Sequence, residues 1–374
     1  MPATHSTNAY RSEIQGLRTI GALLVAVHHI WLNRVSGGVD VFFVISGFLI
    51  TGSLYKDVQR PQGIDVLAFW KRLALRIAPM AYLVLSLTCV AGWLFMPRTV
   101  WDRFGPDLLF SFLQMENLRL MTSAVDYLAR DDAPSATQQF WALSVQVQFY
   151  VVWPFLLIVA ARLAKRAAYP VLVFVLVLLA TFAASLCYSI VETVREPEAA
   201  YFNTLARVWE FALGGLVALI VPHVRLPQQV RLLAGWVGLA AILSCGFVLP
   251  RSATFPGYAA LWPTLGAAFI LLGGSGQSRF GADRILAWKP LVAFGRISFA
   301  FYLWHWPVLI FALLLSRKTS LGLFEGGAVV AIALCGAAAT THWLEQAFSR
   351  RSSASGGAGT HAQSRWEFSP SQPS

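Results

Sequence analysis

Long apolar runs recur along almost the whole chain, and they constrain the fold more than any other feature. A helix that spans a bilayer needs about 20 mostly apolar residues, and ten stretches of this sequence approach that length. The sequence therefore predicts an all-α, polytopic membrane protein with about ten transmembrane helices. We expect them near residues 15–33, 38–55, 77–96, 141–161, 170–190, 204–221, 232–250, 258–274, 291–315 and 324–345.

Charge content excludes a soluble globular protein and a nucleic-acid-binding module. Only 13% of the residues are charged and 57% are hydrophobic, whereas soluble domains carry about a quarter charged residues. The net charge of +11 is spread over successive loops, which suits an anionic membrane surface. No motif that combines aromatic and basic residues for nucleic-acid binding accompanies it. We therefore expect the lipid bilayer, and no nucleic acid, as a partner.

The distribution of Lys and Arg predicts the orientation. The connections after the second, fourth and eighth predicted helices are richer in basic residues than those between them. Because cytoplasmic loops carry the excess of Lys and Arg, both termini are predicted to be cytoplasmic and the long connection at 97–140 to face outward. The N-terminus lacks the apolar region of a signal peptide, so the first helix is expected to stay in the membrane.

Three regions are predicted. Residues 1–12 form a polar N-terminal segment, residues 13–348 form the transmembrane domain, and residues 349–374 form a disordered cytoplasmic tail rich in Ser, Gly and Gln. Each of the four cysteines lies in an apolar stretch and no CxxC pair occurs. The cysteines therefore predict neither a disulfide framework nor a metal site.

Arg18 and His29 lie in one apolar run. Eleven residues make three helical turns plus about 20°, so both side chains are predicted on one face, about 16 Å apart along the axis. Ionisable groups within a membrane are costly and are functional candidates for that reason. The alternative is that Arg18 extends to the headgroups and His29 is a hydrogen-bonded core residue.

The other intramembrane polar residues fall into two predicted layers. Guanidinium groups near the inner face suit the phosphates of an acyl-coenzyme A donor. Farther out, a neutral imidazole can take a proton from an acceptor hydroxyl. For Arg72 and Arg76 the alternative is that they serve only as topology signals. The inner layer holds Arg18, Arg72 and Arg76, and the outer layer holds His29, Asp40, Gln146, Arg207 and Glu210, with His305 nearer mid-membrane.

Six short segments together resemble the acyltransferase-3 family, the integral-membrane O-acyltransferases that modify bacterial O-antigens, exopolysaccharides and other glycoconjugates. The resemblance covers about residues 10 to 348. The segments are Gly16-Leu17-Arg18 followed by His29, the run from Gly38 to Ile50 around Asp40, Arg76-Ile77-Ala78-Pro79, the run from Trp141 to Tyr150, Arg207-Val208-Trp209-Glu210, and Tyr302-Leu303-Trp304-His305-Trp306-Pro307.

The resemblance implies roles for three of these residues. His29 matches the family's essential histidine, which is proposed as the general base. Arg18 matches an arginine thought to engage the donor, and Asp40 matches a recurrent acidic position. The implied reaction, in the bacterial cytoplasmic membrane, moves an acyl group, usually acetyl, from cytoplasmic acetyl-CoA to a hydroxyl of an extracytoplasmic glycan, glycolipid or glycoside. Acetyl-CoA is then a substrate, and no bound cofactor or metal is expected.

Several positions depart from the family pattern. Gln146 stands where a glutamate is usual, Ala142 replaces a serine, and Gln346 lies in the altered last-helix motif. An amide cannot hold a negative charge or take a proton, so Asp40 or Glu210 is expected to replace that glutamate, with Gln146 as a candidate oxyanion donor. Many relatives add an SGNH hydrolase-like domain. We expect none here, so transfer ends in the membrane domain or passes to a separate extracytoplasmic partner.

Three alternatives stay open at this point. A carrier that moves an acyl donor or glycolipid without chemistry would use the same buried charges, although no paired broken helices indicate inverted repeats. A catalytically silent relative would explain Gln146. An enzyme of the membrane-bound O-acyltransferase type would use His305 instead, but the Arg18–His29 spacing and the segment around Asp40 favour the first family. Tyr302 and His305 are kept as further site candidates.

Overall fold

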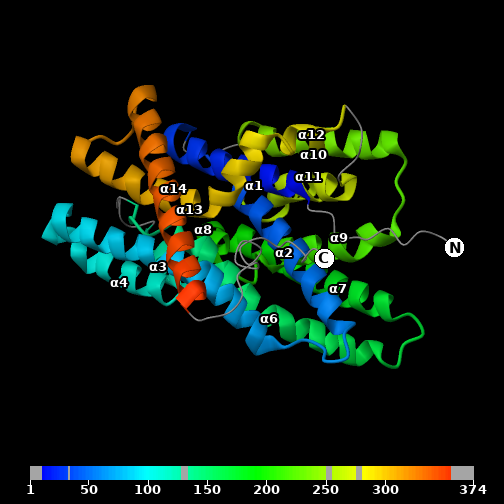
Figure 1. Ribbon diagram of the computed structural model, residues 1–374. Coiled ribbons are helices and arrows are strands. Elements are labelled where there is room, and N and C mark those ends of the chain that lie inside the picture. Colours follow the sequence, from blue (N-terminus) through cyan, green and yellow to red (C-terminus); the bar gives the residue numbers. More distant parts are fainter. Residues whose placement is uncertain (1–10, 33, 128–133, 250–254, 275–279, 355–374) are drawn as a thin grey trace.

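The computed structural model describes residues 11–32, 34–127, 134–249, 255–274 and 280–354. Within these residues the fold is built from fourteen α-helices and short 3-10 or π turns (Figure 1). The helices are α1 (Ser12–Val27), α2 (Gly38–Val58), α3 (Val66–Phe95), α4 (Trp101–Phe112), α5 (Glu116–Tyr127), α6 (Phe140–Ala164), α7 (Pro170–Arg195), α8 (Pro197–Phe202), α9 (Val208–Ile220), α10 (Gln228–Val248), α11 (Leu261–Gly273), α12 (Ala282–Leu286), α13 (Lys289–Ser316) and α14 (Leu323–Ala354).

The predicted all-α membrane architecture is confirmed. Seven helices, namely α2, α3, α6, α7, α10, α13 and α14, are long and apolar enough to cross a membrane. The other three predicted ranges also coincide with helices, but these are shorter: α9 and α11 have 13 residues each, and α1 has 16. The total of ten spans and the side on which the termini lie therefore stay predictions.

Three boundaries differ from the sequence-based prediction. Helix α3 begins at Val66, well before residue 77, and the side chain of Asp65 caps it by accepting a hydrogen bond of 2.9 Å from the Ala68 amide. The connection at 97–140, predicted as a loop, contains α4 and α5. Helix α14 continues to Ala354, into the predicted tail. A search for apolar runs misses such segments because charged residues interrupt them, although a helix tolerates those residues on its polar face.

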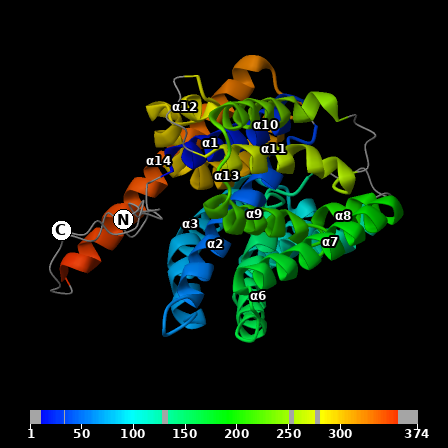
Figure 2. The same cartoon turned by 90° about the vertical axis from the view of Figure 1, so that its right-hand side faces the viewer.

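Helix α2 lies at the centre of the packing. Its residues contribute to two buried apolar clusters, one shared with α3, α6 and α13 and the other with α1, α10 and α11. Figure 2 shows α10, α11 and α12 along one side of the molecule, α3, α6 and α7 on the other, and α9 between them. Polar residues of α2 are therefore placed within reach of several helices at once.

Two glycines let α2 and α9 approach at backbone distance. A Cβ atom built on Gly47 would lie 2.0 Å from the carbonyl oxygen of Phe211, and one built on Gly214 would lie 2.0 Å from that of Val44. No other residue fits at such a contact without moving a helix. The close approach brings the first turn of α9 beside the first turn of α2, where Asp40 lies.

Two prolines within helices release carbonyl groups that side chains then bind. A proline has no N–H, so the carbonyl four residues earlier loses its helical partner. Pro154 in α6 frees the Tyr150 carbonyl, which accepts a hydrogen bond of 3.1 Å from the Trp70 indole of α3. Pro307 in α13 frees the carbonyl of Leu303 in the same way. These prolines therefore create binding points for neighbouring segments.

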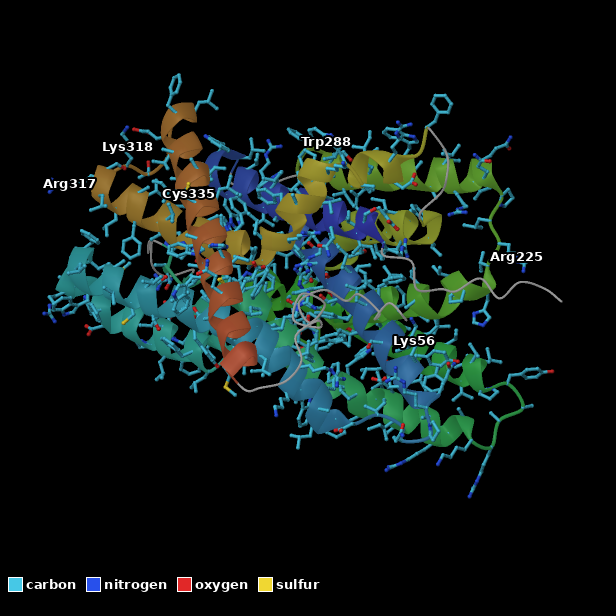
Figure 3. The ribbon with its side chains drawn as sticks, in the orientation of Figure 1. Lys56, Arg225, Trp288, Arg317, Lys318 and Cys335 are labelled. Atoms are coloured by element: carbon cyan, nitrogen blue, oxygen red, sulfur yellow. The ribbon has the colours of Figure 1, made fainter. Side chains whose placement is uncertain are left out.

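Basic residues mark the two ends of the bundle. Lys56 and Arg225 lie toward one end, and Arg317 and Lys318 lie toward the opposite end (Figure 3). The charge pattern predicts that Lys56 faces the cytoplasm and that Arg317 and Lys318 face outward. The termini at 1–10 and 355–374 lie outside the described residues, as do five charged residues of the connections, namely Arg130, Asp131, Asp132, Arg251 and Arg279.

A buried pair of carboxyl groups lies in the α4–α5 segment. Asp107 of α4 and Glu116 of α5 are 2% and 0% exposed, and Arg119 lies 3.5 Å from Asp107. Burial, followed by the charge of Asp107, raises the pKa of Glu116 to about 9. Glu116 is therefore protonated at neutral pH in the folded protein, whereas an unfolded glutamate loses its proton above about pH 4.3.

This pKa shift predicts a pH-dependent stability. Between about pH 4.3 and the folded-state pKa the folded state binds one more proton than the unfolded state, so Glu116 makes the protein less stable as the pH rises. Glu116→Gln is expected to raise the melting temperature by a few degrees at pH 8 and by less at pH 5. The exposed Asp102→Asn serves as a control in the same segment. An equal shift at both pH values would contradict a protonated Glu116.

Candidate functional site

His29 lies where the regular helix α1 gives way to a π-helical turn. Helix α1 ends at Val27, and the turn spans His28–Leu32. Single π turns within helices are rare and occur frequently at functional sites, because the wider turn redirects a side chain. His28 is buried and packs on α10, where a Cβ atom at Gly246 would lie 1.9 Å from its Nε2. His29 is only half-buried and points instead toward α13.

His29 and His305 form a hydrogen-bonded pair. Nδ1 of His29 lies 3.1 Å from Nε2 of His305, and the two rings are stacked with 5.4 Å between their centroids. The Trp306 ring packs edge-on against His29 at 4.7 Å. Nδ1 of His305 lies 2.6 Å from the carbonyl oxygen of Tyr302. His305 is fully buried, whereas His29 is half-buried.

The segment at 135–139 holds this part of α13 in place. The Tyr302 hydroxyl donates to the carbonyl of Gln139 at 2.8 Å, and the Gln139 side chain donates to the Leu303 carbonyl at 3.1 Å. The latter is the carbonyl that Pro307 releases. The Trp306 indole donates to the carbonyl of Ser135 at 2.8 Å. Three hydrogen bonds therefore fix the helical turn that carries His305.

A second group of polar residues lies where α1, α2, α3 and α6 meet. The amide nitrogen of Gln146 donates to the hydroxyls of Ser46 and Tyr150, each at 2.5 Å. The charges of Arg18 and Arg76 both act on the Tyr150 hydroxyl. We call these five residues the arginine–tyrosine cluster. Two guanidinium groups near hydroxyl and amide groups provide the donor set expected for an anionic group such as a phosphate.

A third group pairs one cation with two carboxylates inside the protein. Nη1 of Arg207 lies 3.0 Å from Oδ1 of Asp40 and 2.8 Å from Oε1 of Glu210, and all three side chains are buried. Because a buried charge is stable only when it is paired, these residues hold α2 and α9 together. Four aromatic rings surround the guanidinium group at 5.3 to 5.8 Å, namely Phe43, Trp141, Tyr201 and Phe255.

The structure thus places most of the residues singled out from the sequence in three separate groups. His29 and His305 lie together, and Asp40 pairs with Arg207 and Glu210. Arg18 and Arg76 both act on Tyr150, to which Gln146 donates a hydrogen bond. Arg72 is exposed on α3, one turn before Arg76. Within the described part of the chain, no group of three or more His, Cys, Asp or Glu side chains is arranged to hold a metal ion.

Sequence analysis did not single out several residues of these groups. Tyr150 and Gln139 are ordinary residues of an apolar or polar stretch, and only their contacts reveal a role. Trp306 belongs to the segment from Tyr302 to Pro307, but only the structure shows that it packs on His29. Pro307 is a sequence feature that does point to such a contact. A proline within a helix leaves the carbonyl four residues earlier without its helical partner, so another group must bind that carbonyl.

The chain matches the acyltransferase-3 family, described as an acyltransferase domain, over residues 11–342. This range includes each of the three groups described above. No solved structure matches the chain at a significant level.

Several bacterial proteins resemble the chain over most of its length. YrhL of Bacillus subtilis is 29% identical over 321 residues, which cover 82% of this chain and 50% of that protein. The peptidoglycan O-acetyltransferase OatA of Listeria monocytogenes is 26% identical over 320 residues, with the same coverage. The O-acetyltransferase OatA of Staphylococcus aureus is 25% identical over 312 residues, or 81% and 51% of the two chains. The chain therefore spans about half the length of these relatives.

Proposed function

Since the chain belongs to the acyltransferase-3 family of acyltransferase domains, we propose that it is a membrane O-acetyltransferase that acts on an extracytoplasmic glycan. Acetyl-CoA is the proposed donor, and the proposed location is the bacterial cytoplasmic membrane. The names of the Listeria and Staphylococcus relatives support transfer of acetyl groups, and the former supports peptidoglycan as the first acceptor to test.

The observation that carries the proposal is the hydrogen-bonded pair of His29 and His305, with His29 on the π turn that follows the helix holding Arg18. His29 is half-buried, so the proposal requires that a substrate reach the ring nitrogen that His305 does not occupy. A neutral imidazole within hydrogen-bonding reach of a hydroxyl can act as a general base. Arg18 of the arginine–tyrosine cluster lies on the helix that precedes this turn, and the cations of the cluster suit the phosphates of coenzyme A.

The proposed reaction uses His29 and the arginine–tyrosine cluster together. His29 takes the proton of the acceptor hydroxyl while the oxygen attacks the acetyl carbonyl carbon. The new C–O bond forms, the thioester C–S bond breaks, and the coenzyme A thiolate leaves and is protonated by His29. Arg18 and Arg76 hold the phosphates, so that the extended arm of the donor carries the thioester toward His29. Gln146 lies between Ser46 and Tyr150, where its amide orders the cluster.

A cellular comparison tests the function. Peptidoglycan and other envelope glycans are isolated from cells that express the protein, from cells that lack it and from cells that express His29→Gln at the same level. We expect O-acetyl groups on one glycan class only with the wild-type protein, measured by mass spectrometry before and after mild alkaline release. Identical O-acetylation in all three strains would contradict the proposal.

Removal of one arginine is expected to weaken donor binding. Arg76→Gln should raise the KM for acetyl-CoA by about 10- to 100-fold, because a hydrogen bond to a charged group contributes about 1.5–3 kcal/mol. The kcat should change less, since the substitution leaves His29 in place. Arg225→Gln, an exposed cation at the same end as Lys56, is the control (Figure 3). Equal KM values for the two variants would exclude Arg76 from the donor site.

A further inference from the structure

The geometry around His305 points to a positioning role. We propose that His305 holds His29 in the tautomer that carries its proton on Nδ1 and leaves the lone pair of Nε2 open to the acceptor hydroxyl. This inference rests on the proposed function, in which His29 is the general base. It adds a residue that acts through His29 and does not itself touch the substrate.

The direction of both hydrogen bonds of His305 follows from the carbonyl group of Tyr302. The Tyr302 carbonyl oxygen can only accept, so Nδ1 of His305, at 2.6 Å, must carry the proton. In a neutral imidazole the other ring nitrogen is then an acceptor. Nε2 of His305 lies 3.1 Å from Nδ1 of His29, so Nδ1 of His29 must donate. The lone pair of neutral His29 is therefore on Nε2.

The surroundings prevent His305 from reversing this pattern. Its ring is fully buried and stacks on both His29 and Phe301, at centroid distances of 5.4 and 6.0 Å. The helical turn that bears it is held by the hydrogen bonds of Tyr302 and Trp306 to the segment at 135–139. A ring flip would place a carbon atom against the Tyr302 carbonyl and lose a buried hydrogen bond, which is costly. The protein backbone thus sets the tautomer of a ring two hydrogen bonds away.

A fixed tautomer of His29 matters for its proposed role as a general base. A histidine that is free to exchange tautomers presents a lone pair on either ring nitrogen. Only the Nδ1-protonated form of His29 keeps the lone pair on the nitrogen that faces away from His305. When Nε2 takes the proton, the bond from Nδ1–H to His305 becomes charge-assisted and therefore stronger. His305 then stabilises the imidazolium ion as well as the starting tautomer.

Nuclear magnetic resonance can observe the tautomer directly. The chain has seven histidines, and the ring resonances of ¹⁵N- and ¹³C-histidine-labelled protein in lipid bilayers distinguish the two neutral tautomers. The signal that disappears in His29→Gln is assigned to His29. At pH 8, above the ordinary histidine pKa of about 6.5, we expect His29 to carry its proton on Nδ1. A proton on Nε2 in the wild-type protein would overturn the inference.

Two variants separate positioning from packing. His305→Phe keeps a ring of similar volume but removes the acceptor, whereas the Oε1 of His305→Gln can still accept from Nδ1–H of His29. We expect His305→Phe to shift His29 toward the Nε2-protonated tautomer and to lower kcat at least tenfold with KM for acetyl-CoA unchanged. His305→Gln should keep the wild-type tautomer and recover part of kcat. An unchanged tautomer in His305→Phe, or equal loss of kcat in both variants, would assign His305 to packing alone.

The resonance measurement needs no substrate, so it separates this inference from the proposed function. If the expected tautomer is seen but no acetyl transfer occurs in cells, the proposed function fails and the role of His305 in setting the tautomer stands. If acetyl transfer occurs but the proton of His29 lies on Nε2, the function stands and the role of His305 fails.

Discussion

His29→Gln is expected to lower acetyl transfer by about 10²- to 10⁴-fold, the usual contribution of a general base. Glutamine keeps hydrogen-bonding groups near the acceptor hydroxyl but cannot take its proton at neutral pH. The protein should still fold, because His29 is half-buried at the end of α1 and its hydrogen bond to His305 is one of several interactions there. Initial rates with labelled acetyl-CoA and purified protein measure the effect.

His223→Gln provides the matched control. His223 is exposed just after the end of α9, and its Nδ1 forms a hydrogen bond with the carbonyl of Leu219. The same substitution there should leave the rate within a factor of two. A His29→Gln variant that retains wild-type kcat would exclude general-base catalysis by this residue. Its KM for acetyl-CoA should stay near the wild-type value, since the arginine–tyrosine cluster is untouched.

Arg207→Met is expected to destabilise the protein by about 3–5 kcal/mol, the usual cost of removing one partner from a buried ion pair. Methionine fills much of the aromatic cage but leaves the carboxylates of Asp40 and Glu210 buried without their cation. Both residues lie within the α2–α9 contact, so the loss should loosen these helices first.

A thiol-reactive dye can follow this unfolding near the site. Cys245 is fully buried and lies near enough to Asp40 for the two groups to interact electrostatically. Cys187 and Cys335 are exposed, so we expect them to react before heating. With the partly buried Cys89 replaced by serine in every variant, the melting temperature is read from the dye's reaction with Cys245 on warming in detergent. Arg207→Met should lower this temperature by several degrees relative to the wild-type protein.

Two further variants test whether loss of the buried ion pair causes the destabilisation of Arg207→Met. Combining Arg207→Met with Asp40→Asn and Glu210→Gln removes the charges on both sides, and most of the stability should return because no ion is left buried. Arg60→Met breaks an exposed pair in which Nη1 of Arg60 lies 2.7 Å from Asp57, and it should cost less than about 1 kcal/mol. If Arg207→Met is no more harmful than Arg60→Met, the buried ion pair does not stabilise the fold.

The two polar layers illustrate how far sequence reasoning reached. It placed Arg18 and His29 on one helix and singled out Asp40, Arg207 and Glu210 as intramembrane charges. The structure groups Asp40 with Arg207, 167 positions away, and His29 with His305, 276 positions away. Periodicity reports which face of its own helix a residue occupies. It does not report which helix faces that residue, because that depends on packing between distant segments.

The apolar runs alone indicate that the solvent is a bilayer and that the fold is all-α. Backbone groups in a bilayer must be hydrogen-bonded within the protein, and uninterrupted apolar runs of about 20 residues meet this requirement as helices. All ten predicted runs coincide with helices. Which groups each polar side chain contacts depends on how the helices pack. The π turn at His28–Leu32, the missing side chain of Gly47 and the carbonyl released by Pro307 are each local features. Their consequences depend on a second segment being held within a few ångströms, and many weak contacts across the whole bundle set that distance.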